Sequence, residues 1–567
     1  MDERRRIWKS GISPSVRKHR IAFRCSLCAL SRLSQWPLIF LLSRPTMTDD
    51  GNECGGDGGA TLTYLEFFSG IGGWTLALEK ACRDIANNSN TSCDAASNIS
   101  VRRLASYDHS DLCNAVFAHN FISSDEQNGG GSDAKPPAEK RHKKNQKRAE
   151  ATRRPPPPPT SLPTYPIEKL TSLDLAMLKA DIWVMSPPCQ PHTRQHDHHS
   201  AEEELNDPRS QSFLHLITEL QEIPELGDML GSKGTDLLPS IILLENVVGF
   251  EASASCEMYK RVLSDNGYIY AEFHLNPTQV GIPNDRPRYY CCAVKDTSRG
   301  NGAGGVVSKQ LMGMFQNSGS IESSSVPFPS APRILSVPHI RTSIPSLGVV
   351  EPGSPDMASA LPTISVYLDR DLPPLANDAS SINTEKLDKV QISKKTIEKS
   401  AAWCFDIVTQ DDARSACFTS SYGKFIRGTG SVLYYGSDNS IVKDSSAHDA
   451  QGKADGQATD TFRLVDPKER TYDATWWEQL VSGDDDAPPL RYLSDEEVAR
   501  LMGFPPKEDA TDSTESTFNF PEWCTEKQKW RLLGNSINVA VSSRIAELGI
   551  RMITSKKSDE ECKQHTT

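Results

Sequence analysis

The sequence reads TLTYLEFF at residues 61–68, SGIGG at residues 69–73 and WTLALEKACR at residues 74–83. The first run has the apolar and aromatic content of a strand, and the third has apolar residues at helical spacing. Glycines between a strand and a helix let the backbone approach a ligand closely at the helix N-terminus. Because the spacing differs from G-x-G-x-x-G, the turn does not specifically indicate a dinucleotide. The ordered chain therefore begins with a strand, a turn suited to a ligand and a helix.

Strand and helix patterns alternate after this first unit. Strands that end in polar or glycine residues, with helices between them, are typical of a doubly wound α/β sheet, whose ligands bind at the carboxyl ends of the strands. We therefore predict an α/β fold with a doubly wound, mostly parallel sheet. The further elements are expected to be strands at Leu104–Tyr107, Asp181–Met185, Ile241–Leu244, Tyr268–Leu275 and Arg288–Val294, and a last helix at Asn538–Met552.

Length and composition limit the class of protein. A chain of 567 residues has room for one large domain and a smaller one. Its net charge of −12 argues against a generally basic surface, so a nucleic-acid partner would need a local basic patch. The 14 cysteines are scattered rather than arranged as a disulfide framework, which favours a reducing compartment, and we expect the cytoplasm or the nucleus. No apolar run is long enough to predict a membrane span.

Two basic segments are expected to lie outside the folded core. Residues 1–46 have the composition of an organelle-targeting leader or of an upstream extension before a start at Met47, and we favour the extension. The basic, proline-rich insertion at about 123–163 is predicted to be disordered. In decreasing order of weight, it is interpreted as a solvated loop, a nuclear-import signal or a phosphate-binding arm.

The same patterns divide the chain into segments. The expected segments are a leader or disordered N-terminus at 1–60, a catalytic domain at 61–296, a linker and target-recognition region at 297–490, a part that completes the catalytic domain at 491–552 and a disordered tail at 553–567.

Residues with catalytic potential follow two of the predicted strands. Cys189 stands in SPPCQP at 186–191, where the prolines fix the backbone and would hold a nucleophilic sulfur in place. Glu245 follows the apolar run IILL, so partial desolvation would raise its pKa and let it donate a proton to a ring nitrogen. Taken alone, such a cysteine is more often structural and such an acid more often faces solvent.

Two arginines and an aspartate complete the set. Arg286 and Arg288 lie two residues apart in an extended segment, so both guanidiniums are expected to point the same way, toward a base carbonyl or a phosphate. Asp108 ends the second strand, where an acid commonly accepts a hydrogen bond from a ribose hydroxyl. Two surface arginines taken alone are usually solvated. The prediction of a functional site therefore depends on the combination of these motifs.

Together these motifs resemble the DNA cytosine-5 methyltransferase family, from about Thr61 to Met552. Further segments resemble its tRNA-aspartate methyltransferase branch, whose members methylate cytosine 38 of an anticodon loop. The family motifs are FSGIGG, SPPCQP, ENV, GIPNDRPRYY and LGNSINV, and the branch motifs are CFTSSYG at 417–423, GTGS at 428–431, DPR at 207–209, SFLH at 212–215 and LMGFPP at 501–506.

The resemblance implies a Rossmann-like methyltransferase fold that uses S-adenosylmethionine and carries a smaller target-recognition region. It implies that Cys189 adds to C6 of the cytosine and that Glu245 holds N3. It also implies that Arg286 and Arg288 bracket the base carbonyl and the neighbouring backbone. The residues implied for the S-adenosylmethionine pocket are Ile71, Gly72, Gly73, Asp108, Ile167, Glu168 and Ser536, with Glu168 near the adenine.

Two alternatives to a tRNA methyltransferase remain open. The CFT segment and the lack of upstream zinc-finger or chromatin-reading modules favour tRNA over DNA as the substrate. A catalytically silent RNA-binding relic would not need the intact set of catalytic residues. His192 stands where the family has an apolar or aromatic residue; with the other histidines of 196–199 it resembles a polar loop more than a zinc site, and no metal is expected.

Overall fold

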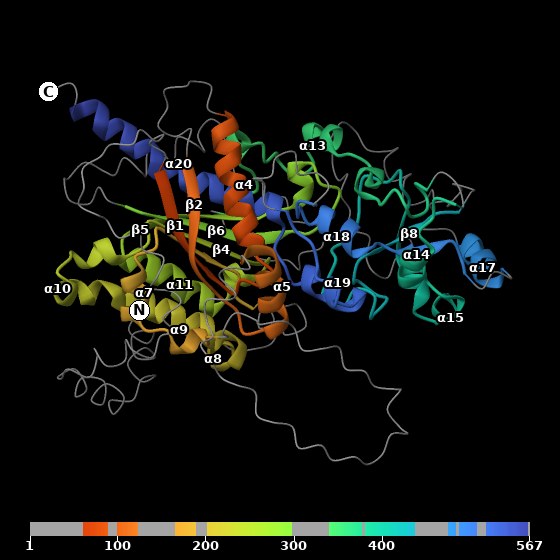
Figure 1. Cartoon of the computed structure of the whole chain (residues 1–567), viewed down its shortest axis with the longest axis horizontal. Helices are drawn as coiled ribbons and strands as arrows, with labels where there is room; N and C mark the ends of the chain where they lie inside the picture. Colours follow the sequence, from red (N-terminus) through yellow and green to blue (C-terminus); the bar gives the residue numbers. More distant parts are fainter. Residues whose placement is uncertain are drawn as a thin grey trace, which may run out of the picture. The chain divides into compact units, whose positions relative to one another are not determined.

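A six-stranded sheet forms the centre of the computed structural model (Figure 1). Its strand order is β2-β1-β3-β4-β6-β5. The first four of these strands pair in parallel, and β6 is antiparallel to both of its neighbours. The predicted α/β class with a mostly parallel sheet is therefore confirmed. The strands are β1 (Ala60–Phe67), β2 (Ile99–Tyr107), β3 (Ile182–Met185), β4 (Ile241–Val247), β5 (Tyr268–Leu275) and β6 (Arg288–Lys295).

The structure describes most, but not all, of the chain. The predicted leader, the basic insertion, Cys189 and the histidines of 192–199 lie outside the described residues. The described residues are 60–88, 99–122, 165–188, 201–296, 340–376, 380–436, 474–483, 487–506 and 517–564.

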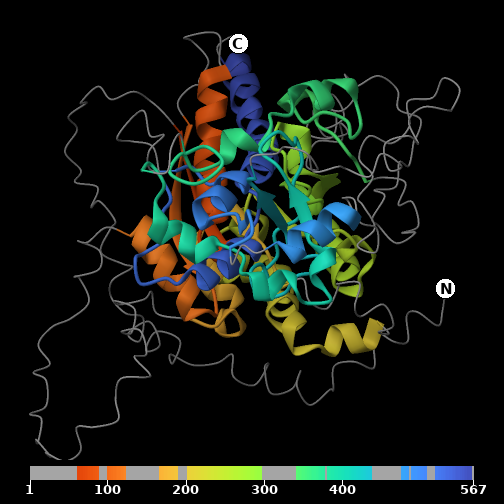
Figure 2. The same ribbon diagram turned by 90° about the vertical axis from the view of Figure 1, so that its right-hand side faces the viewer.

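Helices cover both faces of the central sheet. On one face α4 (Gly73–Asn88) and α20 (Val539–Gln564) pack side by side, as Figures 1 and 2 both show. On the other face lie α7 (Ser172–Leu178), α9 (Pro208–Glu222) and α11 (Ala254–Asp265). The remaining helices are α5 (Asp111–Phe121), α8 (Ala201–Asn206), α10 (Gly227–Leu230), α13 (Pro355–Ala360), α14 (Thr384–Val390), α15 (Lys394–Ile397), α17 (Ala474–Ser482), α18 (Asp495–Leu501) and α19 (Glu526–Gly534).

The strand sequences explain the two apolar layers. Successive side chains of a strand point to opposite faces of the sheet. In β3, Ile182 and Val184 belong to the core beneath α4 and α20, whereas Trp183 and Met185 belong to the core beneath α9 and α11. A strand that must fill both layers has no polar position, which is why β3 reads as a continuous apolar run.

Local sequence also fixes where helices begin. The side chain of Asp207 accepts a hydrogen bond from the N–H of Arg209 at the start of α9, and Pro208 occupies the first helical position. Ser494 and Glu497 form a reciprocal capping box at the start of α18.

None of the helices in the described part of the chain has the length and apolarity that crossing a bilayer requires.

A second, three-stranded sheet lies in the region expected to recognise the target. It has the order β7-β8-β9, and its strands are β7 (Asp406–Val408), β8 (Ser431–Tyr434) and β9 (Leu490–Tyr492).

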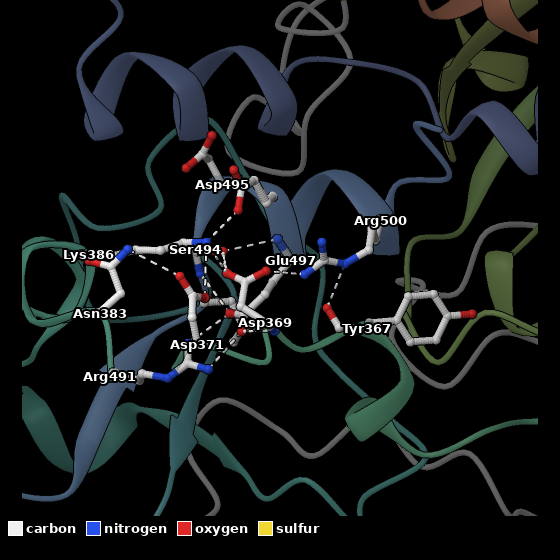
Figure 3. Close-up of polar contacts among 12 residues, drawn as sticks. Tyr367, Asp369, Asp371, Asn383, Lys386, Arg491, Ser494, Asp495, Glu497 and Arg500 are labelled. Atoms are coloured by element: carbon white, nitrogen blue, oxygen red, sulfur yellow. Dashed lines mark hydrogen bonds and ion pairs between the residues drawn. The ribbon is translucent and has the colours of Figure 1, made fainter. Parts of the chain in front are cut away.

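A buried ionic cluster joins this region to α18 (Figure 3). Arg491 and Glu497 are both fully buried and lie 2.7 Å apart, Nη1 to Oε2. Asp369 forms an ion pair with Arg500 and another with Lys386, 3.0 Å away. Because buried charges are tolerated only when they are paired, the cluster fixes the segment from Asp369 to Lys386 against α18.

Three boundaries differ from the prediction. α20 continues to Gln564, so the tail predicted to be disordered from residue 553 is helical through most of its length. The expected linker contains α13, α14 and α15, because scattered apolar residues such as Ile364 and Val390 pack into the core despite a loop-like composition. β4 runs three residues beyond Leu244, since Glu245 pairs with Tyr290 of β6.

Candidate active site

The carboxyl ends of the parallel strands meet at one edge of the sheet. Phe67 of β1 is in register with Met185 of β3, and Met185 is in register with Leu244 of β4. The residues that follow these three positions therefore lie in neighbouring rows. This arrangement brings the glycine turn, the segment 186–188 and Glu245 side by side at the edge where doubly wound sheets bind their ligands.

Backbone hydrogen bonds hold the glycine turn against the end of β2. The N–H of Ser69 donates to the carbonyl of Tyr107 at 3.1 Å, and the N–H of Gly70 donates to Oδ2 of Asp108 at 2.9 Å. The other carboxylate oxygen of Asp108 accepts from the N–H of Ser110 at 2.8 Å. Each oxygen keeps a second lone pair, so Asp108 is fixed in place and can still accept a hydrogen bond from a ligand.

The glycine turn also contacts the C-terminal segment. Gly72 has a φ of 88°, a backbone conformation that residues with a side chain rarely adopt. A Cβ on Gly73 would lie 2.6 Å from Cγ1 of Ile537 and 3.3 Å from Oγ of Ser536, so this close approach requires a glycine. The side chain of Ile71 is buried in the core, which leaves its backbone to face a ligand.

Ile167 and Glu168 lie in the short 3-10 helix η4 (Ile167–Lys169). Ile167 is buried, whereas Glu168 accepts a hydrogen bond from Ser212. Partial burial raises the pKa of Glu168, but the Ser212 hydroxyl and nearby histidines, His109 among them, outweigh it and lower the pKa overall. Because His109 adjoins Asp108, Glu168 lies near the end of β2 as an ionised acceptor.

One buried hydroxyl of the glycine turn is left without a partner. Ser69 is buried, and its Oγ makes no hydrogen bond to any residue that the structure describes. Such a group is costly unless a ligand or water bonds it. With the N–H groups at the start of α4 and the carboxylates of Asp108 and Glu168, it suits a ligand that carries hydroxyl and amino groups.

Two side chains anchor the segment that precedes Cys189. The indole N–H of Trp74, at the start of α4, donates to Oγ of Ser186 at 2.8 Å. The side-chain amide of Asn246 in β4 donates to the carbonyl of Pro187 at 3.2 Å. Residues 186–188 are thus tied to elements on both sides, and the position of Cys189 itself lies beyond the residues that the structure describes.

Glu245 of β4 and Arg288 of β6 are diagonal neighbours on adjacent strands, and their side chains are in contact. Nε of Arg288 lies 3.5 Å from Oε1 of Glu245, and both side chains are largely buried. Burial raises the pKa of Glu245, and the two guanidiniums of Arg288 and Arg286 only partly oppose this effect. Glu245 therefore keeps its proton to a higher pH than an exposed glutamate does.

Arg286 has a different role from the one predicted. It is buried; Nη1 donates to the carbonyl of Phe418 at 2.7 Å, and Nη2 donates to the carbonyls of Gly534 at 3.0 Å and Ser536 at 2.6 Å. The predicted contact with the base carbonyl is corrected accordingly, because these backbone carbonyls engage Nη1 and Nη2 of the buried side chain, and only Nε has no partner among the described residues. β6 begins only at Arg288, so the period-two argument that aligned the two arginines does not apply.

Cys417 is the residue of this site that the sequence reasoning missed. Its Sγ lies 3.4 Å from Nη1 of Arg286 and 3.8 Å from Nη2 of Arg288. The CFT segment carries the signal, but the resemblance uses it only to mark the branch and implies no role for its cysteine. The structure therefore adds a thiol to the charged residues around Glu245.

The chain is similar to several known proteins. Residues 159–550 match the family model described as C-5 cytosine-specific DNA methylase. A human protein named tRNA (cytosine(38)-C(5))-methyltransferase is 26% identical over 516 residues, which cover 86% of this chain and 98% of that protein. A Dictyostelium discoideum protein named DNA (cytosine-5)-methyltransferase is 28% identical over 396 residues, covering 68% of this chain and 80% of its own. The crystal structure of the S. pombe Dnmt2 methyltransferase has a TM-score of 0.47 and 24% identity, covering 87% of this chain and 99% of its own.

Proposed function

The chain belongs to the C-5 cytosine-specific DNA methylase family, and we propose that it methylates C5 of cytosine 38 in the anticodon loop of a tRNA, with tRNA-Asp as the expected substrate. The name of the human relative supports tRNA, and that relative is matched over nearly its whole length. The name of the Dictyostelium relative favours DNA as the second candidate substrate.

One observation carries the proposal most directly: a buried carboxyl, whose pKa burial raises, contacts an arginine beside an anchored nucleophile segment. Glu245 and Arg288 can together offer a proton donor and a cation to one edge of a pyrimidine ring. Residues 186–188 are held at the neighbouring strand end. Cysteine 189 follows them directly in the sequence.

In the proposed reaction the thiolate of Cys189 adds to C6 of cytosine. The electron pair of the C5–C6 double bond moves toward N3, where the carboxyl of Glu245 donates its proton. The resulting enamine makes C5 nucleophilic, which unmodified cytosine is not. After methylation, a water molecule takes up the C5 proton, the C5–C6 double bond re-forms as the Cys189 sulfur leaves C6, and N3 returns its proton to Glu245.

S-adenosylmethionine would supply an electrophilic methyl group on a sulfonium. Its binding is assigned to backbone and side-chain groups at the carboxyl edge of the sheet, since the orphaned Ser69 hydroxyl and the fixed Asp108 carboxylate suit its ribose and amino groups. The residues proposed to hold it are Ile71, Gly72, Gly73, Asp108, Ile167, Glu168 and Ser536.

An anticodon loop suits this chemistry energetically. The target base must leave its stack to reach the site, which costs a few kcal/mol in a duplex and less in a loop. Sequence-specific recognition of RNA generally uses such splayed bases.

A nuclear or cytoplasmic location is part of the same proposal.

Methyl transfer from labelled S-adenosylmethionine tests the proposal. The protein is incubated with tRNA or with duplex DNA, and Cys189→Ala is treated in parallel. We expect label in the tRNA with the wild-type protein and none with Cys189→Ala. Label in DNA but not in tRNA would reverse the substrate assignment, and equal labelling by the variant would exclude the cysteine mechanism.

A further inference from the structure

The active-site edge contains more buried positive charge than its carboxylates neutralise. Arg286 is only 3% exposed, and its guanidinium contacts three backbone carbonyls and the sulfur of Cys417. Among the residues that the structure describes, no carboxylate forms an ion pair with Arg286. Arginine keeps its charge in proteins, and a buried unpaired cation is strongly unfavourable.

The nearby carboxyls do not supply the missing negative charge. Glu245 pairs with Arg288 rather than with Arg286, and burial holds it toward its protonated form. Asp285 accepts from the side-chain amide of Asn276 at 2.7 Å, and burial raises its pKa as well. Asp406 is paired with Arg414 at 2.7 Å. Glu245 attracts Arg286 electrostatically, but none of these carboxyls forms an ion pair with it.

Among the described residues, the remaining candidate is the thiol of Cys417, between the two guanidiniums. A neutral thiol would donate a hydrogen bond, and the acceptor in reach is the carbonyl of Phe418 at 3.7 Å. Arg286 already donates to that carbonyl at 2.7 Å. An ionised sulfur, by contrast, accepts from both arginines at 3.4 and 3.8 Å. That carbonyl could still accept from a thiol through its second lone pair, so the geometry favours a thiolate through the two cationic donors that converge on the sulfur.

We infer that Cys417 is a thiolate that neutralises the buried Arg286–Arg288 pair and thereby lets Glu245 keep its proton. Burial raises the pKa of the Cys417 thiol, but the two guanidiniums outweigh burial and lower it below the ordinary value of cysteine. The same guanidiniums act on Glu245 in the opposite sense, toward loss of its proton. A negative sulfur beside them weakens that pull, so Cys417 is a positioning residue that tunes the proton of Glu245.

The effect of Cys417 on methyl transfer rests on the proposed function, whereas its ionisation does not. A thiolate absorbs ultraviolet light that a thiol does not, so ionisation is measured without nucleic acid or cofactor. Cys189→Ser protein, which lacks the other expected thiolate, is titrated between about pH 5 and pH 9 and compared with Cys189→Ser carrying Cys417→Ser. The matched control removes Cys256, a buried cysteine whose pKa burial raises to about 12.

We expect Cys189→Ser protein to show one thiolate that forms at lower pH than an ordinary cysteine, which Cys417→Ser abolishes and Cys256→Ser leaves unchanged. Absence of that thiolate in the Cys189→Ser protein overturns the inference, whether or not the Cys417 variant folds. Absence of methyl transfer by the wild-type protein, with the thiolate present, would instead contradict the proposed function.

The pH profile of methyl transfer tests the consequence. Without the negative charge of the sulfur, the two arginines lower the pKa of Glu245 further. The alkaline limb of the kcat profile of Cys417→Ser therefore moves to lower pH. A shift of one pH unit corresponds to an about tenfold lower rate on that limb. Cys417→Asp restores a negative charge and is expected to return the limb toward the wild-type position. A uniform loss of rate with an unshifted profile in Cys417→Ser would mean that the cysteine acts only through packing.

Discussion

The bond between Trp74 and Ser186 is predicted to support catalysis by fixing the segment before the nucleophile. Trp74 is 1% exposed, and its indole N–H donates to the Ser186 hydroxyl at 2.8 Å. Trp74→Phe keeps an aromatic ring in the core and removes the donor. A neutral hydrogen bond of this kind contributes about 1 kcal/mol net. If that energy serves mainly to position residues 186–188, kcat should fall about fivefold.

A double-mutant cycle separates this bond from general packing. Wild type, Trp74→Phe, Ser186→Ala and the double variant are compared for tRNA methylation and for unfolding by urea. Both single changes remove the same bond, so the double variant should be less impaired than the sum of the singles, by about 1 kcal/mol in the free energy of activation. Additivity within about 0.3 kcal/mol would refute the reasoning, because the two side chains would then act independently.

Three further predictions concern buried charge. Burial raises the pKa of Glu66 from 4.5 to about 7, so folding favours its protonated form. The contribution of Glu66 to stability is fully present below about pH 4.5 and falls by roughly 3 kcal/mol as the pH rises to 7. Urea unfolding of Glu66→Gln should lack this part of the pH dependence. The lysine of Arg286→Lys lacks the planar guanidinium that donates to three backbone carbonyls. The free energy of unfolding should therefore fall by about 3 kcal/mol. A change below about 0.5 kcal/mol would contradict the role of Arg286 in tethering these segments. Glu245→Gln removes the proton donor and should lower kcat about 100-fold or more at unchanged folding; a near-normal single-turnover rate would rule out proton donation.

The sheet and its functional edge were accessible from sequence because they depend on local patterns. The run TLTYLEFF and the glycines after it specify a strand and a turn, and the carboxyl edge follows from the rule for parallel strands. The registers of Phe67, Met185 and Leu244 confirm that these strand ends lie in adjacent rows. Motif order along one sheet was therefore enough to predict which strand ends meet.

The environment of Arg286 was not accessible because its partners are distant in the chain. Phe418 and Gly534 lie 132 and 248 residues from it, and no periodicity links positions so far apart. The same holds for Cys417, which lies 131 and 129 residues from Arg286 and Arg288 along the chain. Tertiary packing determines the contacts of side chains that join remote segments. Residue type indicated that Arg286 carries a charge, but it could not indicate which groups surround that charge.

The short helices of the expected linker show a related limit. α13, α14 and α15 contain between four and seven residues each, too few for a reliable helical period. They are held by contacts such as the buried side chain of Val390 and the ion pair between Lys386 and Asp369. The composition of this segment predicted a loop, because its short helices are stabilised by contacts with the surrounding chain and not by their own sequence.

The central claim is a covalent bond between the sulfur of Cys189 and C6 of the target cytosine. An anticodon stem-loop that carries 5-fluorocytidine at the target position tests it, because fluorine replaces the proton whose loss releases the enzyme. With S-adenosylmethionine present, we predict a denaturant-stable complex of one protein and one RNA, with the RNA attached to the peptide that contains Cys189. A complex that persists in Cys189→Ala, or an RNA attached to Cys417, would contradict the account.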